Sequence, residues 1–312
     1  MYKRQAKKDV AHSVFPSTTA AALTSILTGV WPGQHGLVGY RVLDPARGIL
    51  VNQLTGWESE GLDPATWQAA PTVFERARAE GRPTFAVGVA AYAASGFTRA
   101  TLRGAEFVAA QTPAERVEVA YDLAESHPGS LIYCYLPEAD KAGHRYGLDS
   151  VQWVSALEEI DAALSRRVPP GVGVLVTSDH GMVDVPVHRQ VVLEAEHLDG
   201  VRHIGGEPRM LHVYVEPDAD AAVVAERWRR DLEGLADVGT GQEAIASGFF
   251  GPEVTSAAAT RIGDVLVVAR GNGAVYDGTA ADQRGRGMIG QHGGLTPEER
   301  QVPLLRFGAF AR

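Results

Sequence analysis

Three segments that lie far apart in the sequence combine aspartate and histidine within short polar stretches. The residues are Asp140 and His144, which stand four apart, the adjacent Asp179 and His180, and His292 in the tetrapeptide QHGG. Mixed carboxylate and imidazole ligands suit zinc or manganese better than calcium or magnesium. Five such ligands exceed what one catalytic ion with an open coordination position can use, so the set predicts two divalent metal ions.

Each of these histidines taken alone has a simpler explanation, because a single buried histidine usually serves as a hydrogen-bonded core residue. The combination favours a metal centre instead. One helical turn would present Asp140 and His144 on the same face, and Asp179 and His180 follow an apolar run of strand length. The glycines after His292 let the backbone approach a site closely.

A threonine at the start of a helical segment is the candidate nucleophile. Thr19 ends the string Phe15-Pro-Ser-Thr-Thr and begins the expected helix 19–29. A hydroxyl in this place is ordinarily an N-cap, which is the structural alternative. The same geometry directs backbone N–H groups and the positive end of the helix dipole at a neighbouring anion. Beside two metal ions, such a hydroxyl can attack phosphorus.

The elements that must position these residues alternate between strand length and helical period. This alternation predicts an α/β fold with a mostly parallel central sheet sandwiched by helices. In such a sheet the ligand crevice lies beyond the carboxyl ends of the strands, which places the polar loops together. The expected strands are 84–89, 130–136, 172–177, 211–215 and 264–268, and the expected helices are 19–29, 71–81, 112–126, 150–168 and 219–235.

Two further expectations concern these elements. The second half of helix 150–168 should turn Leu157, Ile160, Ala163 and Leu164 inward. The stretch 13–19 has the pattern of a strand end followed by a helix start, without a recognisable element before it.

Composition limits the class of protein and its partners. The chain has 312 residues, 45% of them hydrophobic, and a formal net charge of -9, which disfavours binding to duplex nucleic acid but allows a small anionic substrate. Its one cysteine, Cys134, lies in an apolar run and is expected to be a buried strand residue in a reducing compartment. With neither a membrane span nor a signal peptide recognisable, the expected location is cytoplasmic.

The order of four motifs resembles one known family. The string FPSTTAAALTSILTGVWPGQHGLVGY is followed by DKAGH, SDHGM and GQHGG, and the likeness extends from Val14 to Leu305. This pattern is similar to the type I phosphodiesterase and nucleotide pyrophosphatase branch of the alkaline phosphatase superfamily. The resemblance implies that Thr19 is the nucleophile, that one zinc is held by Asp140, His144 and His292, and that the other is held by Asp179 and His180.

The sequence departs from the family pattern in two places. The family has a further aspartate ligand at the end of a first strand, and the acid upstream of Thr19 here, Asp9, stands in a different context. Ala22 takes a position where nucleotide pyrophosphatases often have asparagine. The resemblance therefore implies a truncated chain: residues 6–312 form a single catalytic domain lacking its first strand, and residues 1–5 are a non-native leader.

The expected reaction is hydrolysis of a phosphodiester or pyrophosphate bond through a phospho-threonine intermediate, on a small phosphorylated substrate such as a nucleotide. Two alternatives within the superfamily are a phosphomonoester and the C–P bond of a phosphonate. An alternative of another class is an inactive fragment that binds metal or phosphate. The expected partners include neither a nucleic-acid duplex nor a membrane.

Other motifs are expected to be structural. The string Gly285–Gly290 matches a dinucleotide fingerprint but leads directly to His292, so we interpret it as the segment that precedes the metal-binding loop. His35 should buttress the turn after the nucleophile helix. The turn 205–208, between His203 and Arg209, could overhang the site but more simply forms a hairpin. Tyr146 and Arg41 are further candidates for substrate contact.

Overall fold

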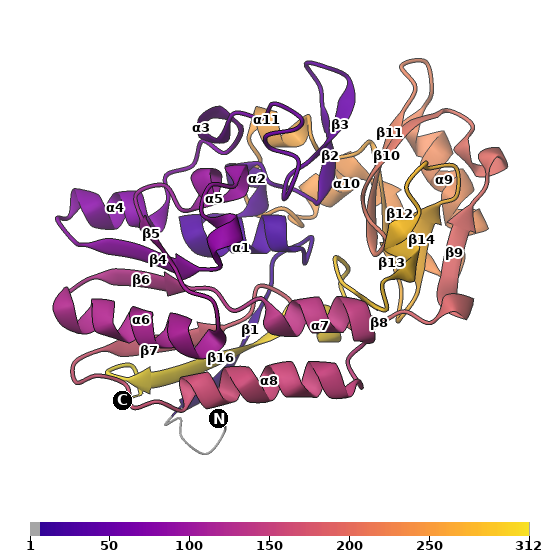
Figure 1. Cartoon of the computed structure of the whole chain (residues 1–312). Coiled ribbons are helices and arrows are strands. Elements are labelled where there is room, and N and C mark those ends of the chain that lie inside the picture. The colour runs from indigo at the N-terminus through magenta and orange to yellow at the C-terminus, as the bar shows by residue number, and fades with distance from the viewer. Residues whose placement is uncertain (1–6, 312) are drawn as a thin grey trace.

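The computed structural model describes residues 7–311 and contains two three-stranded sheets (Figure 1). The first sheet is parallel, with β4 between β5 and β6. In the second, β16 lies between β1 and β7 and runs antiparallel to both. Their bounds are β5 Glu106–Ala109, β4 Thr84–Gly88, β6 Leu131–Cys134, β1 Lys7–His12, β16 Gln301–Gly308 and β7 Gly173–Thr177.

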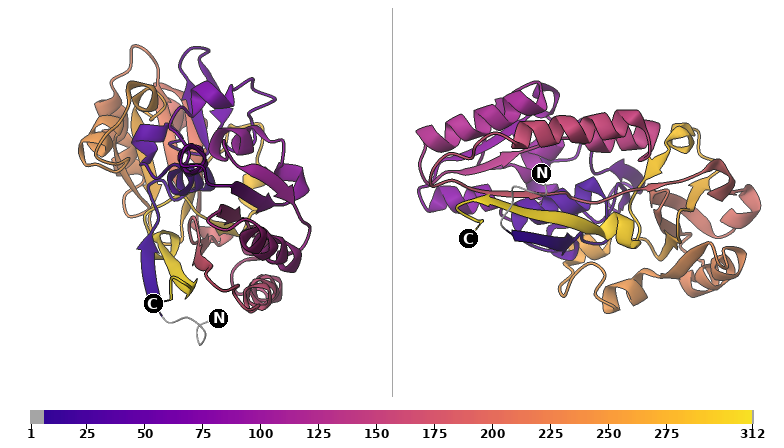
Figure 2. Two further views of the ribbon diagram at one scale, coloured as in Figure 1. Left: turned by 90° about the vertical axis from the view of Figure 1, so that its left-hand side faces the viewer. Right: turned by 90° about the horizontal axis from the view of Figure 1, so that it is seen from below.

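Helices cover the strands from both sides (Figure 2). The helix α6 packs on β4 and β6, and α8 packs on α6 and α7, whereas α4 contacts β4 and α1 contacts α4 and α5. The helices span α1 Thr19–Thr28, α4 Val73–Ala79, α5 Gly96–Thr101, α6 Pro113–Ser126, α7 Glu138–Tyr146 and α8 Val151–Leu164. The mixed α/β class expected from the sequence is confirmed.

A four-stranded antiparallel sheet builds the other end of the molecule, in the order β10-β11-β13-β12. The helix α9 covers it and buries Trp228 and Leu232 against Val213 and Val265. The bounds are β10 Val201–Glu207, β11 Met210–Val215, β12 Ala236–Thr240, β13 Val265–Ala269 and α9 Ala221–Asp231. The hairpin turn between β10 and β11 reaches back toward α1.

Short elements connect these parts. They are α2 Pro32–His35, β2 Arg41–Asp44, β3 Ile49–Asn52, α3 Pro64–Trp67, η1 Ala90–Tyr92, β8 Val183–Asp184, η2 Val187–Arg189, β9 Gln190–Leu193, η3 Ala195–Leu198, α10 Gly241–Ala246, α11 Ser256–Ala259, β14 Ala274–Asp277, η4 Arg284–Gly287, β15 Gly290–Gln291 and α12 Pro297–Arg300. Among them, β9 and β14 pair in parallel, and β8 and β15 pair antiparallel.

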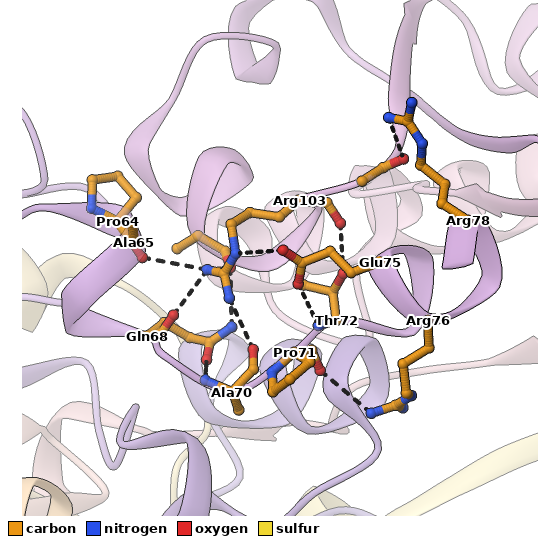
Figure 3. A network of polar contacts seen from close by, with 12 residues as sticks. Pro64, Ala65, Gln68, Ala70, Pro71, Thr72, Glu75, Arg76, Arg78 and Arg103 are labelled. Carbon is orange, nitrogen blue, oxygen red and sulfur yellow. Dashed lines mark hydrogen bonds and ion pairs between the residues drawn. The ribbon is translucent and has the colours of Figure 1, made fainter. Parts of the chain in front are cut away.

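Local sequence signals explain several helix starts. At α6 the Thr112 hydroxyl accepts a hydrogen bond from the Glu115 N–H, and the Glu115 carboxylate accepts one from the Thr112 N–H, which is the capping box expected from the sequence. The helix α4 begins with the same arrangement at Thr72 and Glu75. Glu75 also contacts Arg103, whose guanidinium donates to the carbonyls of Gln68 and Ala70 (Figure 3).

Three expectations about individual elements need correction. A strand does precede residue 13, because β1 pairs along its whole length with β16, and Asp9 in it forms an ion pair with Arg306. Leu157 does not turn inward but is 39% exposed on α8. Cys134 lies in the expected strand but is half-buried rather than buried, although desolvation still raises the pKa of its thiol to about 12.

Two apolar strands keep a free edge. Within residues 7–311, β6 pairs only with β4 and β7 only with β16. Leu131 and Leu175 are 36% and 55% exposed on these strands, whereas every residue of β4 is buried. The expected leader, residues 1–5, lies outside the described residues. Among the described helices, none is long and apolar enough to cross a membrane.

Candidate metal and nucleophile site

Asp140, His144 and His292 come together at the carboxyl end of β6. Asp140 and His144 lie one turn apart on α7, as expected, and His292 follows β15. Their ligand atoms all lie within 4.8 Å of one another. His144 Nε2 is 3.2 Å from His292 Nε2 and 3.4 Å from Asp140 Oδ1. This spacing is compatible with a single ion bound by all three side chains.

Backbone carbonyls determine which ring nitrogen of each site histidine is free. Nδ1 of His144 lies 2.8 Å from the Gly290 carbonyl, that of His292 3.0 Å from the Ser17 carbonyl, and that of His180 2.9 Å from the Gly181 carbonyl. A carbonyl oxygen can only accept, so each Nδ1 carries a hydrogen, and in the neutral ring each Nε2 then presents a lone pair. Such outer partners are typical of metal-binding histidines.

The short distance between Nε2 of His144 and Nε2 of His292 tests whether a metal ion fits between these side chains. Two lone pairs 3.2 Å apart repel each other unless a cation or a proton lies between them. Burial, followed by the proximity of His180 and His144, lowers the pKa of His292 well below its ordinary value. Protonation of His292 is therefore disfavoured, and the donor set fits a divalent metal ion.

Thr19 joins this cluster through His180. The Thr19 Oγ1 lies 3.1 Å from His180 Nε2, and that nitrogen lies 3.4 Å from Asp179 Oδ2. The rings of His180 and His292 stack with their centroids 3.6 Å apart. The structure thus brings together all six residues that the sequence selected, from α1, α7, the loop after β7 and the loop after β15.

The Thr19 hydroxyl does not cap its own helix. The N-cap of α1 is Thr18, which makes no side-chain capping bond, and Thr19 is the first helical residue. The first N–H groups of a helix have no partner within the helix, and together with the helix dipole they attract an anion. The N-terminus of α1 therefore faces the space beside Thr19 with a positive partial charge.

Tyrosines after the parallel strands complete the surroundings. Tyr135 follows β6 and stacks on Tyr133, with 6.1 Å between the ring centroids. Burial and then the negative charge of Asp179 raise the pKa of both phenols well above the ordinary value. Both tyrosines therefore stay neutral at physiological pH.

Sequence reasoning missed a buried carboxyl group at this site. Glu207, in the turn expected to be a simple hairpin, is buried, and its Oε1 has no hydrogen-bond partner within residues 7–311. Burial raises its pKa to about 8, and the charge of Glu299 adds to the effect. Gly293 has a φ of +125°, and a Cβ there would lie 2.7 Å from Glu207 Cγ. The adjacent pair Gly-Gly after His292 was the available signal for this close approach.

His35, His203 and Gly290 make contacts of a structural kind, whereas substrate contact by Tyr146 or Arg41 stays a prediction. His35 is buried and accepts a hydrogen bond from the Leu37 N–H, and His203 contacts the Gly48 carbonyl. Gly290, at the end of the dinucleotide-like string, accepts from His144. The Tyr146 ring stacks under Arg145, and Arg41 lies in the β2–β3 hairpin.

Comparison with known proteins identifies the family of the chain. The family model for type I phosphodiesterase / nucleotide pyrophosphatase matches residues 1–295. A pyrophosphatase/phosphodiesterase of Schizosaccharomyces pombe is 25% identical over 58% of this chain and 39% of its own length. An ectonucleotide pyrophosphatase/phosphodiesterase of Caenorhabditis elegans is 25% identical over 92% of this chain and 34% of its own length. The chain thus spans less than half the length of these curated relatives.

Solved structures share the fold. Phosphonoacetate hydrolase from Sinorhizobium meliloti, in complex with phosphonoformate, superposes with a TM-score of 0.72 at 21% identity, covering 97% of this chain and 82% of that one. An inactive threonine-to-alanine variant of murine ectonucleotide pyrophosphatase / phosphodiesterase 5, in complex with AMP, gives a TM-score of 0.65 at 16% identity, covering 95% and 80%. The architecture is alkaline phosphatase-like, and the chain belongs to the type I phosphodiesterase / nucleotide pyrophosphatase family.

Proposed function

We propose that this protein hydrolyses phosphodiester or pyrophosphate bonds in small phosphorylated substrates with the help of two divalent metal ions. The observation that carries the proposal is the position of Thr19. Its hydroxyl lies at a helix N-terminus, 3.1 Å from His180 Nε2 and next to a cluster of convergent histidine lone pairs. A hydroxyl in this place is set for attack on phosphorus rather than for helix capping.

The residues divide the work as follows. Asp140, His144 and His292 would hold one ion, and Asp179 and His180 the other. Bound ions supply Lewis-acid stabilisation of the charge that develops on the phosphoryl and leaving oxygens. Thr19 Oγ1 loses its proton and forms a bond to phosphorus while the bond to the leaving-group oxygen breaks; the leaving oxygen takes up a proton and departs as a hydroxyl group, giving phospho-threonine. The N–H groups at the start of α1 face the phosphoryl oxygens. Water then cleaves the phospho-threonine, releasing the phosphoryl group and restoring the hydroxyl.

The neighbours support a small phosphorylated substrate. One solved neighbour is bound to AMP and is inactive as a threonine-to-alanine variant, and another is bound to phosphonoformate. By analogy we propose a nucleotide as one substrate class and zinc, or alternatively manganese, as the metal. The closer structural likeness to phosphonoacetate hydrolase makes phosphonate cleavage the second candidate.

The second metal position has fewer protein ligands than the first. Asp179 and His180 supply two ligand groups there, and the adjacent strands β6 and β7 each keep a free edge within residues 7–311. We propose that a further parallel strand ending in a carboxylate completes both the sheet and this position. Metal analysis of the purified 312-residue chain tests the proposal. One tightly held ion and a second, weakly held ion per chain are expected, and two tightly held ions would show that the second position needs no added ligand.

The variant T19A tests the reaction itself. We expect it to lose hydrolysis of bis-p-nitrophenyl phosphate by about 10³-fold or more while its metal content stays normal. Thr24 provides a matched control, because it lies on the same helix and donates its hydroxyl to the Ala20 carbonyl, 2.6 Å away. T24A should retain activity. Undiminished turnover in T19A would exclude the nucleophile role.

A substrate panel separates the alternatives. Hydrolysis of a diester, of p-nitrophenyl phosphate and of phosphonoacetate would use the same metal centre, but a different bond breaks in each reaction. A preference for the diester supports the proposed activity, whereas a preference for the monoester or for phosphonoacetate assigns the alternative. Absence of turnover on all three, together with tight metal binding, indicates a non-catalytic metal or phosphate binder.

A further inference from the structure

A buried ion pair lies behind the metal and nucleophile loops. Arg209 and Glu299 are both completely inaccessible to solvent. Arg209 Nε donates to Glu299 Oε1 at 2.9 Å, and Nη2 donates to Glu299 Oε2 at 2.6 Å. A hydrophobic pair of similar volume would usually stabilise a core at least as well, because two charges must be stripped of water. The pair therefore calls for a reason other than stability.

The partners of Glu299 indicate that reason. Its carboxylate also accepts hydrogen bonds from the Gly294 N–H at 2.8 Å and from the Thr296 hydroxyl at 2.8 Å. Its backbone carbonyl accepts from the Gly181 N–H at 2.7 Å. Gly294 follows His292 by two residues, and Gly181 follows His180 directly. One residue thus holds the loops of both expected metal positions.

The pair also fixes the nucleophile turn. The Gly294 carbonyl accepts from the Ser17 hydroxyl at 2.8 Å, and Ser17 pairs with Gly293 through an isolated β-bridge. Arg209 belongs to the turn between β10 and β11, and Glu207 at the end of β10 packs on Gly293, where a Cβ would lie 2.7 Å from Glu207 Cγ. A Cβ at Gly294 would lie 2.8 Å from Glu299 Oε2, so the loop is packed directly on the ion pair.

We propose that Arg209 and Glu299 are positioning residues, which set the distance and orientation of His292 and His180 relative to Thr19. The proposal rests on the function proposed above for these residues. The bidentate contact fixes the plane of the Glu299 carboxylate, and the carboxylate in turn fixes the Gly294 backbone. The four-stranded sheet thereby becomes part of the catalytic framework through its β10–β11 turn.

The chain offers a matched control in Arg103 and Glu75. Both glutamates are the third residue of a helix with a threonine capping box, Thr296 for Glu299 and Thr72 for Glu75, and both contact an arginine. Arg103 likewise ties backbone carbonyls of a loop, those of Gln68 and Ala70 (Figure 3). None of the contacts of that network involves a residue of the proposed site.

The test compares the double variants R209M/E299M and R103M/E75M. Replacing both partners avoids the isolated buried charge that a single change would leave. The first readout needs neither metal nor substrate: the ¹⁵N shifts of the His180 and His292 rings report which nitrogen carries hydrogen. We expect R209M/E299M to lose the single Nδ1–H form of His292, and R103M/E75M to keep it. An unchanged ring signal in R209M/E299M overturns the proposal.

Metal affinity and kinetics give the second readout. Loss of an outer partner typically weakens metal binding about ten- to hundredfold, and we expect that loss for cobalt in R209M/E299M, with an altered visible spectrum and a lower kcat at similar KM. R103M/E75M should match the wild type. If the wild-type chain binds metal but has no activity, the proposed function fails while the ring signals still decide the positioning role. If R209M/E299M does not fold, R209M/E299Q, which keeps an acceptor for the Gly294 N–H without leaving a buried charge, takes its place in the same measurements, with R103M/E75Q as its control.

Discussion

The histidines of the proposed metal site differ from His35 and His212, which are buried elsewhere, in the backbone group that faces Nδ1. His144, His180 and His292 each point Nδ1 at a carbonyl oxygen. His35 and His212 instead accept at Nδ1 from the N–H groups of Leu37 and Gly263. In the first group Nε2 is left as a lone pair. In the second group Nε2 carries the hydrogen. It donates to the Ser25 hydroxyl in His35 and to the Val38 carbonyl in His212.

This difference shows that burial alone does not distinguish a ligand from a structural histidine. Among these five histidines, the backbone partner at Nδ1 separates the two groups, because it decides whether Nε2 of the neutral ring is free to bind a cation. His212 has no need of a metal, since both of its nitrogens are satisfied at 3.0 Å. His292 has one satisfied nitrogen, and the other faces His144 Nε2 at 3.2 Å. The structure therefore separates the two groups before any ion is considered.

The largest expected effect comes from converting a ligand histidine while keeping its backbone contact. In H292N the side-chain amide can still donate to the Ser17 carbonyl, but nothing replaces Nε2. We expect metal affinity at this position to fall sharply and phosphodiesterase activity to fall by about 10³-fold or more, since bound metal contributes several kcal/mol to the barrier. Metal titration and steady-state kinetics measure both.

H212N is the matched variant in the other group. The amide can accept from the Gly263 N–H, while the contact with the Val38 carbonyl is lost. We expect activity within a few-fold of the wild type and a lower free energy of unfolding. If H292N instead retained full metal affinity, the distinction drawn from the ring nitrogens would be wrong.

Sequence spacing selected the candidate ligand residues because their residue types recur in short motifs, and their role as ligands stays a prediction. Asp140 and His144 need only a helical turn between them, and Asp179 and His180 need only a strand before them. The residues that hold the loops of these candidate ligands in place could not be predicted from short motifs. Arg209 and Glu299 are 90 positions apart, and their pairing depends on how the β10–β11 turn packs on α12. Ion pairs of this kind leave no periodic signal in a sequence.

The strands show the same limit. The apolar runs predicted β4 and β7, because such runs are typical of strands that are covered on both sides. The strand β1 was missed, since KKDVAH has neither apolar continuity nor clear alternation and depends on its partner β16. The expected loss of a first strand implies a neighbouring strand with an unpaired edge, but it did not identify Leu131 and Leu175 as the exposed residues.

An intermediate effect is expected from acid, through His35 and His212. Burial lowers the pKa of His35 to about 3 and that of His212 to about 4. The unfolded chain takes up these protons near pH 6.5, so between pH 6.5 and 4 the unfolded state binds more protons than the folded state. Each histidine should then lower the free energy of unfolding by roughly 1.4 kcal/mol for every unit by which the pH is lowered within this range.

Urea unfolding of the metal-free chain between pH 7 and 4.5 measures this slope. Other groups titrate in the same range, so the informative quantity is the difference between the wild type and H212N. We expect the slope to be shallower in H212N by the contribution of one proton. Equal slopes would mean that His212 is charged in the folded state, contrary to its hydrogen bonds.

The smallest expected effect comes from His203, which belongs to neither group. It is half-buried, and its Nε2 lies 3.1 Å from the Gly48 carbonyl. One neutral hydrogen bond at a partly exposed site contributes about 1 kcal/mol, so H203N should lower the free energy of unfolding by no more than that. Metal affinity and activity should stay at wild-type values. A loss of metal in H203N would mean that the hairpin turn affects the site through His203 as well as through Glu207 and Arg209, and the ion pair would then share its positioning role.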